Sequence, residues 1–200
     1  MAITTPPRAA EIERSTRETS IRLRLALDGS GECAASTGVG FLDHMLDLLA
    51  RHGRLDLEVE ATGDLETGTH HTTEDIGIVL GQALDRALGD RSGIARYGDA
   101  TVPMDEALAA CAIDVSGRPY CVFEGTIPEA TIGGWETELT EEFFRAIANN
   151  ARLTAHVRLL AGTNAHHMIE ASFKAFARAL RAAVSLDDSV TGIPSTKGVL

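Results

Sequence analysis

Two short segments of the chain carry the same arrangement of potential metal ligands. His70-His71-Thr72-Thr73-Glu74 recurs 96 positions later as His166-His167-Met168-Ile169-Glu170, and each copy opens an apolar helical run. On a helix, the Glu projects about 40° from the first His and about 60° from the second. One carboxylate can therefore join one imidazole at one metal ion while the other imidazole points to a different ion. Imidazole and carboxylate donors together suit divalent first-row metals.

The ordinary interpretation of a single His-His pair is a surface or helix-capping feature. Two copies with the same i, i+1, i+4 spacing, each at a helix start, favour metal binding instead. Neither copy has the HExxH pattern of zinc proteases. The pattern therefore predicts two metal positions built by a duplicated fold.

The duplication extends beyond these histidines. Residues 25–31 (LALDGSG) align with residues 111–117 (CAIDVSG), and both are typical of a strand entering a turn. Residues 44–59 (HMLDLLARHGRLDLEV) align without gaps with residues 142–157 (EFFRAIANNARLTAHV), and each copy reads as a helix, a break and a strand. Three aligned blocks in the same order indicate a repeat rather than a chance similarity of two unrelated α+β segments.

Long helices are expected to close both halves. Apolar residues recur at helical spacing from Ile76 until Gly89, and again from Ile169 to position 184. Each half then reads as strands, helix, strand, helix. The expected organisation is a flexible N-terminal arm (1–15), a first half-domain (16–92), a second half-domain (93–186) and an ordered C-terminal loop (187–200).

The repeat also identifies ligand candidates outside the His-His pairs. His44 opens the first short helix, and its counterpart in the second half is Glu142. If His44 binds one metal ion, pseudo-symmetry places Glu142 at the equivalent position on the other. The alternative for Glu142 is a solvated carboxylate in the first helical turn, where the helix dipole favours it.

Several basic residues are candidates for binding a phosphate. They are Arg96, Arg118, Lys174 and, in the tail, Lys197 close to Ser195. Arg binds phosphate through two parallel hydrogen bonds, and Lys adds a point charge. Taken singly, each is an ordinary surface charge. The tail is more specific, because it combines hydroxyls, glycine and an ammonium within five residues.

Composition narrows the class of protein. The net charge of −11 argues against nucleic-acid and anionic-membrane partners, which need a basic face. Three cysteines without a CxxC pair indicate reduced thiols rather than a disulfide framework or zinc knuckle. No apolar stretch has transmembrane length, and residues 1–7 lack a signal-peptide core. We therefore expect a cytoplasmic protein.

Six segments together resemble imidazoleglycerol-phosphate dehydratase of histidine biosynthesis. FLDHML, HHTTEDIGIVLGQAL, RYGDATVPMDEAL, DVSGRP, NAHHMIEASFKAFARALR and PSTKG are similar to motifs of that family, in the same order, and the resemblance covers about residues 14–200. It implies an α+β fold of two half-domains, each a four-stranded sheet backed by helices, as in domain 2 of ribosomal protein S5. It also implies the stand-alone form, since the length leaves no room for the phosphatase domain fused to it in some bacteria.

The resemblance further implies trimers assembled into a 24-subunit shell, with two Mn²⁺ ions per active site at subunit interfaces. Carried over by position, the metal ligands are His44, His70, His71, Glu74, Glu142, His166, His167 and Glu170. One departure matters, because the family usually has His where this chain has Glu142. A carboxylate oxygen is a suitable donor for manganese.

The family reaction is a carbon–oxygen hydro-lyase step of L-histidine biosynthesis, which converts D-erythro-imidazole glycerol phosphate to imidazole acetol phosphate. The resemblance assigns acid/base work to Glu18, which otherwise reads as an exposed residue beside Arg17, and Glu170 is a further candidate base. Asp105 is a candidate for orienting a ligand or the substrate, or else a turn cap. The implied substrate-binding residues are Glu18, His52, Arg96, Arg118, Lys174, Ser195 and Lys197.

Two other classes fit the residues alone. A dinuclear metallohydrolase, such as a phosphatase, would use the same metals to activate water and would release inorganic phosphate. A non-enzymatic metal-binding shell would need no phosphate cluster, so Ser195 and Lys197 count against it. Residue spacing alone does not decide which bond breaks.

Overall fold

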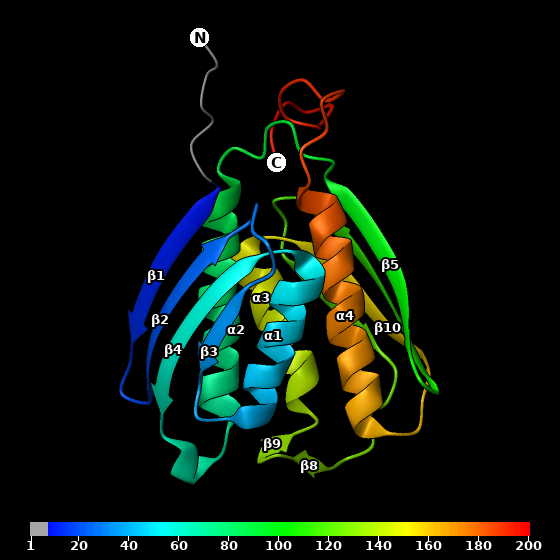
Figure 1. The fold of residues 1–200 in the computed structure, drawn as a ribbon. Coiled ribbons are helices and arrows are strands. Elements are labelled where there is room, and N and C mark those ends of the chain that lie inside the picture. The colour runs from blue at the N-terminus through cyan, green and yellow to red at the C-terminus, as the bar shows by residue number, and fades with distance from the viewer. Residues whose placement is uncertain (1–7) are drawn as a thin grey trace.

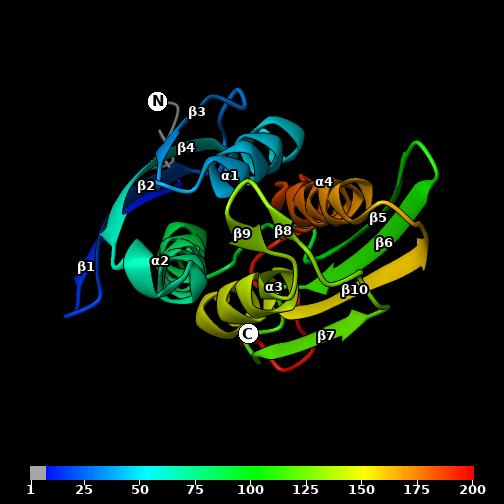
Figure 2. The same cartoon turned by 90° about the horizontal axis from the view of Figure 1, so that it is seen from below.

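The computed structural model describes residues 8–200, in which two four-stranded sheets have a layer of helices between them and β8 and β9 form a separate two-stranded sheet (Figure 1, Figure 2). The first half contains β1 (Ala9–Ser15), β2 (Thr19–Ala26), β3 (Cys33–Ser36), α1 (Gly40–Gly53), β4 (Asp56–Gly63), the short 3-10 helix η1 (Leu65–Thr67) and α2 (His70–Leu88). The second contains β5 (Tyr97–Met104), β6 (Ala107–Asp114), β7 (Tyr120–Glu124), β8 (Thr131–Ile132), β9 (Trp135–Glu136), α3 (Leu139–Ala151), β10 (Thr154–Ala161) and α4 (Ala165–Val184).

The two large sheets have the same topology. Their strand orders are β1-β2-β4-β3 and β5-β6-β10-β7, and in each sheet the last-named pair is parallel while the others are antiparallel. The helices α1 and α3 both end at an arginine with left-handed backbone, Arg54 (φ 52°) and Arg152 (φ 56°), which the repeat had aligned. The predicted duplicated α+β fold is confirmed.

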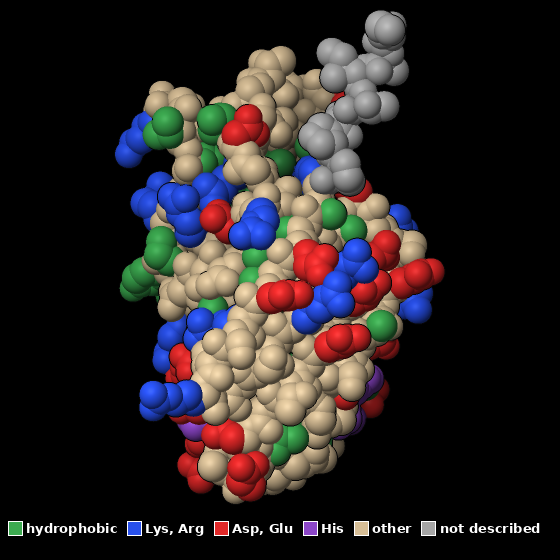
Figure 3. Space-filling view, turned by 90° about the vertical axis from the view of Figure 1, so that its left-hand side faces the viewer, with side chains coloured by type: hydrophobic (Ala, Val, Ile, Leu, Met, Phe, Trp, Pro, Cys, Tyr) green, Lys and Arg blue, Asp and Glu red, His purple; other side chains and the backbone are tan. Residues whose placement is uncertain are grey.

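Alternation along the strands gives each sheet one buried face. In β2, Ile21, Leu23 and Leu25 are at most 2% exposed, whereas the intervening Arg22 and Arg24 face outward. On the outer face both arginines pair with Glu11, at 2.7 and 3.3 Å. The side of the molecule in Figure 3 accordingly shows acidic and basic side chains intermixed.

The helices of the two halves interlock across the centre of the molecule. The short helix α1 packs on α4 of the other half, and α3 packs on α2 (Figure 2). Phe144 lies at the middle of an aromatic core, with ring centroids 4.9 Å from Phe173 and 5.0 Å from Phe176. This exchange of partners brings the start of α1 beside the start of α4, so residues of the two repeats meet.

The N-terminal prediction is wrong for residues 9–15. These residues are not a flexible arm but strand β1, which pairs antiparallel with β2 from Ala9↔Ala26 to Ser15↔Ser20. Ile12 is 8% exposed and joins the core, and Arg14 forms an ion pair at 2.9 Å with the buried Asp75. The remaining part of the predicted arm, residues 1–7, lies outside the described residues.

The last fourteen residues contain no helix or strand. Their course is fixed by hydrogen bonds from Gly93 N–H to Gly192 C=O (2.9 Å) and from Arg96 Nη1 to Pro194 C=O (2.8 Å). Within residues 8–200, no helix combines the length and apolarity needed to cross a membrane.

Candidate metal centre

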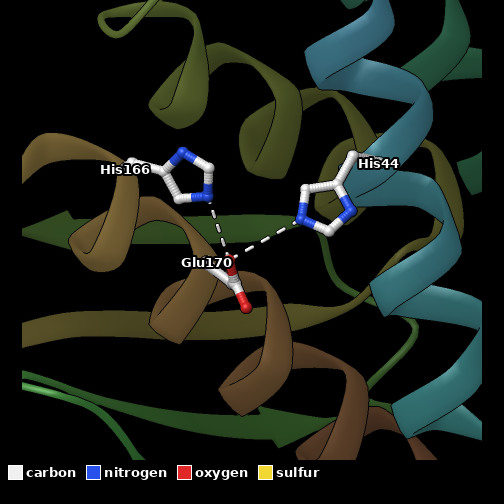
Figure 4. A group of neighbouring side chains, drawn as sticks. All are labelled: His44, His166 and Glu170. Atoms are coloured by element: carbon white, nitrogen blue, oxygen red, sulfur yellow. Dashed lines mark hydrogen bonds and ion pairs between the residues drawn. The ribbon is translucent and has the colours of Figure 1, made fainter.

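Three predicted ligands from both halves meet between α1 and α4 (Figure 4). His44, His166 and Glu170 each offer one ligand atom, and these atoms lie within 4.8 Å of one another. Oε2 of Glu170 is 3.1 Å from His166 Nε2 and 3.7 Å from His44 Nε2. His166 and Glu170 share one face of α4 because they are four residues apart, and α1 supplies His44 from the other repeat.

Glu170 is the buried member of this cluster. Its side chain is 8% exposed, and its second oxygen, Oε1, accepts a 2.6 Å hydrogen bond from Lys174 one turn further along α4. Burial raises the pKa of Glu170, but the Lys174 hydrogen bond and charge, together with His166 and His44, outweigh it and lower the pKa below the ordinary value. Glu170 is thus ionised, with Oε1 held by Lys174 and Oε2 available to a metal ion.

The second histidine of each pair lies between two carboxylates. Nδ1 of His71 is 3.1 Å from Asp64, and its Nε2 is 3.9 Å from Glu18. In the other half, Nδ1 of His167 is 2.7 Å from Glu106, and its Nε2 is 3.7 Å from Asp105. The strands β1–β2 and β5–β6 are equivalent hairpins, so Glu18 and Asp105 occupy corresponding turns.

These contacts shift the acid–base equilibria of both histidines. The hydrogen bond that His71 donates to Asp64 raises the pKa of His71, and the one that His167 donates to Glu106 raises the pKa of His167. The hydrogen bond from His167 has the largest effect on Glu106, and the backbone N–H groups of Asn164 and Thr163 add to it. Together these hydrogen bonds lower the pKa of Glu106 to about 2. Asp105 has a left-handed backbone (φ 48°), an uncommon conformation for a residue other than glycine.

The remaining predicted ligands do not form a comparable cluster. Nε2 of His70 lies 3.9 Å from Oε2 of Glu74 one turn along α2. Glu142, which the repeat places opposite them, instead pairs with Arg145 on its own helix at 2.7 Å. The pseudo-equivalents of His44, His166 and Glu170 are therefore present but are not brought together within this chain.

The predicted phosphate-binding residues occupy two regions. Lys174 lies at the metal cluster, and burial followed by the charges of Lys174 and Arg178 lowers the pKa of the nearby His52. Arg96 is not free for a ligand, because its guanidinium pairs with Asp114 at 2.8 Å and binds the tail. Arg118 is largely exposed and donates to Ser116 C=O at 3.3 Å.

In the tail, Ser195 Oγ accepts a hydrogen bond from the backbone N–H of Lys197 at 3.2 Å. This bond closes the turn that carries both predicted phosphate ligands. The turn is linked to Arg96 through the adjacent Pro194, so Arg96 positions the tail in this structure rather than lining a pocket.

Sequence reasoning did not identify Asp64 and Glu106 as partners of the histidines. Asp64 follows β4 and Glu106 belongs to the β5–β6 turn, where acidic residues are common. Only the tertiary fold brings them to the starts of α2 and α4. The signal available for Glu106 was its place beside Asp105 in a segment already noted for its resemblance.

The donor set fits a divalent first-row metal ion. Two imidazole nitrogens and one buried carboxylate oxygen converge without a thiolate, which suits manganese, iron or zinc rather than a soft-metal site. Cys111 is buried, and burial raises the pKa of the Cys33 thiol to about 11, so these two thiols are neutral packing groups at neutral pH.

Comparisons with known proteins agree on one family. The family model described as "Imidazoleglycerol-phosphate dehydratase" matches residues 37–180. The chain is 61% identical over 193 residues to the protein of that name from Moorella thermoacetica, covering 96% of this chain and 98% of that one. It is 59% identical over 194 residues to the protein from Azorhizobium caulinodans, with coverage of 96% and 98%.

Solved structures give the same result. The crystal structure of imidazoleglycerol-phosphate dehydratase from Staphylococcus aureus matches with a TM-score of 0.81 and 45% identity, over 90% of this chain and 99% of that chain. IGPD from Pyrococcus furiosus in complex with (S)-C348 matches with a TM-score of 0.81 and 38% identity, over 94% and 100%.

Proposed function

The chain belongs to the imidazoleglycerol-phosphate dehydratase family, hydro-lyases of histidine biosynthesis, and we propose that it converts D-erythro-imidazole glycerol phosphate to imidazole acetol phosphate with two Mn²⁺ ions per active site. The observation that carries the metal dependence is the convergence of His44, His166 and Glu170. Bound manganese would supply Lewis acidity toward the imidazole of the substrate. His70, His71, Glu74, Glu142 and His167 would complete the two metal positions.

Two carboxylates are proposed to handle protons. Glu18 lies on the β1–β2 turn, 3.9 Å from Nε2 of His71, where it can protonate the leaving hydroxyl. Glu170 is ionised and buried, and is the candidate to accept the proton lost from carbon. Asp105 faces His167 as Glu18 faces His71, and is suited to orient the substrate.

The phosphate of the substrate would be bound by basic residues at two places. Lys174 and His52 lie next to the metal cluster, and Ser195 and Lys197 come from the C-terminal loop. Arg118 is exposed and can turn toward an anion, whereas Arg96 holds the loop in place. Phosphate binding by this set would select the phosphorylated imidazole as substrate.

The distribution of the ligand candidates supports assembly into an oligomer. His70 and Glu74 lie at the start of α2 without a third donor from Glu142 in its observed pairing, so we propose that a neighbouring subunit completes the set. Trimers that join into a 24-subunit shell would place the sites at subunit interfaces. We propose a cytoplasmic enzyme without a nucleic-acid or membrane partner.

Incubation of manganese-loaded protein with imidazole glycerol phosphate tests the function. The expected product is the enolisable ketone imidazole acetol phosphate, with its phosphate retained. Release of inorganic phosphate without the ketone would identify a metallohydrolase instead. Protein stripped of metal by a chelator is the control, and unchanged turnover in it would contradict the metal dependence.

A further inference from the structure

In each of the two His-His pairs, one ring nitrogen of the second histidine is hydrogen-bonded to a carboxylate. Nδ1 of His167 lies 2.7 Å from Oε2 of Glu106, and Nδ1 of His71 lies 3.1 Å from Oδ2 of Asp64. An ionised carboxylate only accepts hydrogen bonds, so each Nδ1 carries the hydrogen. The lone pair of each Nε2 is then free for a ligand.

We propose that Asp64 and Glu106 are positioning residues that hold His71 and His167 in the Nδ1–H tautomer, with Nε2 directed at the metal ions. This inference rests on the proposed function, because it assigns the two carboxylates to support of the metal ligands. A carboxylate behind a metal-binding imidazole fixes the orientation of the ring and increases its basicity. Although the two carboxylates belong to different loops, they serve equivalent histidines of the repeat.

The two carboxylates differ in what else they bind. Oε1 of Glu106 accepts hydrogen bonds from the backbone N–H groups of Asn164 (2.8 Å) and Thr163 (3.2 Å). Glu106 therefore also fixes the turn that begins α4. Both oxygens of Asp64 face the same nitrogen of His71, at 3.2 and 3.1 Å, so either of them can serve as the acceptor.

Because of this difference, replacing each carboxylate with the amide of the same shape should have opposite effects on the tautomer of its histidine. In Glu106→Gln, the two backbone N–H groups require an acceptor, so the amide oxygen takes the place of Oε1. The amide NH₂ then faces Nδ1 of His167, which must accept, and the hydrogen moves to Nε2, where it blocks metal binding. In Asp64→Asn, the amide can turn its oxygen toward Nδ1–H of His71 and keep the tautomer.

Manganese titration of metal-free protein tests the proposal, with free Mn²⁺ measured by electron paramagnetic resonance. The unsubstituted protein should bind two ions per chain. E106Q should bind one of them about 10–100-fold more weakly. D64N should lose less than about tenfold, whereas D64A, which removes the acceptor, should show the larger loss.

The tautomer gives a readout that a purely structural role would not change. Nitrogen-15 spectra of the histidine-labelled, metal-free E106Q variant should show one Nδ1–H imidazole replaced by an Nε2–H imidazole. Unchanged spectra and metal affinity in E106Q, or equal losses in D64N and D64A, would overturn the proposal. A lack of manganese binding by the unsubstituted protein would refute the proposed function, and the spectra would still decide the tautomer.

Discussion

At the scale of single residues, the two copies of His-His-x-x-Glu are alike in sequence but differ in structure. The copy in α4 lies beside His44 and forms a cluster with it, because α1 packs on α4. The copy in α2 has Glu142 as its counterpart partner, and Glu142 pairs with Arg145. The ligand candidates could be predicted from the repeat. The orientation of each side chain could not, because it depends on local ion pairs that residue spacing does not reveal.

Substitution of Glu142 tests its assignment as a ligand. Glu142→Ala should lose one metal ion per chain or bind it far more weakly, with a sharp fall in activity. Glu142→His should retain metal, because imidazole is the usual donor of the family at this position. Metal analysis of the purified variants decides the question.

If Glu142 were only a first-turn carboxylate, the Ala variant would keep its metal content. It would then lose at most about 0.3–1 kcal/mol of stability through the helix dipole. Arg145→Ala is a matched control, since it removes the ion-pair partner but no ligand.

Protonation of His71 and His167 should compete with metal binding. Asp64 and Glu106 raise the pKa of these imidazoles, so both stay protonated to higher pH than an ordinary histidine of pKa about 6.5. Metal affinity should therefore rise as the pH passes through the raised pKa values of the two histidines. The pairing of each protonated histidine with its carboxylate stabilises the metal-free fold below these pKa values, and that stabilisation is lost as the pH rises through them. Nuclear magnetic resonance titration of metal-free protein measures both values.

D64N should lower the pKa of His71 and leave that of His167 unchanged, because the two pairs lie in different halves. If both histidines of the unsubstituted protein had the pKa of an ordinary histidine, this account would be contradicted.

At the scale of elements, the helices and the paired strands were predictable because their apolar spacing and turn residues are strong local signals. The α2 run from Ile76 to Gly89 and the α4 run are two examples. Strand β1 was missed because its sequence, AAEIERS, has a single large apolar residue, Ile12. Its pairing with β2 and the contact of Arg14 with Asp75 are tertiary effects. The packing of α1 on α4 and of α2 on α3, which joins the two halves, could not be predicted because no local sequence pattern indicates it.

Gly77 and Gly81 permit the close packing of α2 on α3. A Cβ at Gly81 would lie 2.7 Å from Ile147 C=O and 3.0 Å from the backbone nitrogen of Ala151. Gly81→Ala should therefore destabilise the protein, because overpacking costs about 1–3 kcal/mol and exceeds the gain of roughly 1 kcal/mol in helix propensity. Denaturant unfolding of metal-free protein measures the difference.

Gly40→Ala is the matched control in a helix, since a Cβ there meets nothing within 4 Å. If the two variants had equal free energies of unfolding, the packing of α2 on α3 would not depend on the absence of a side chain at Gly81.

The C-terminal loop offers a test of phosphate binding that is separate from the metal. Lys197→Ala should weaken binding of the phosphorylated substrate by about 1.5–3 kcal/mol, as expected for a charge-assisted contact. Metal content should not change, because no ligand is touched. Lys174→Ala should alter both, because Lys174 binds Glu170 at 2.6 Å. An unaltered KM and kcat for the Lys197 variant would remove the loop from the phosphate site.

At the scale of the whole molecule, the ligand candidates lie at the starts of four different helices, and among the described residues only one group of three meets within the chain. A hollow of about 650 Å³ lies over the first sheet, lined by residues of β1 to β4 and by none of these donors. Within the described residues, a single chain thus brings only part of the predicted ligand set together. The repeat predicts ligand candidates, but it does not say how each proposed metal position would be completed, because contacts between copies of a chain leave no signal in residue spacing.

Metal removal should therefore change the size of the particle. Because each metal ion would join ligands of neighbouring subunits, chelation should release smaller species, with trimers as the expected product, and manganese should restore the shell. Light scattering on chelated and reloaded protein measures this directly. Magnesium, which prefers all-oxygen ligands, is the control ion and should not restore assembly. A particle of the same full size with and without manganese would show that protein contacts alone hold the subunits together.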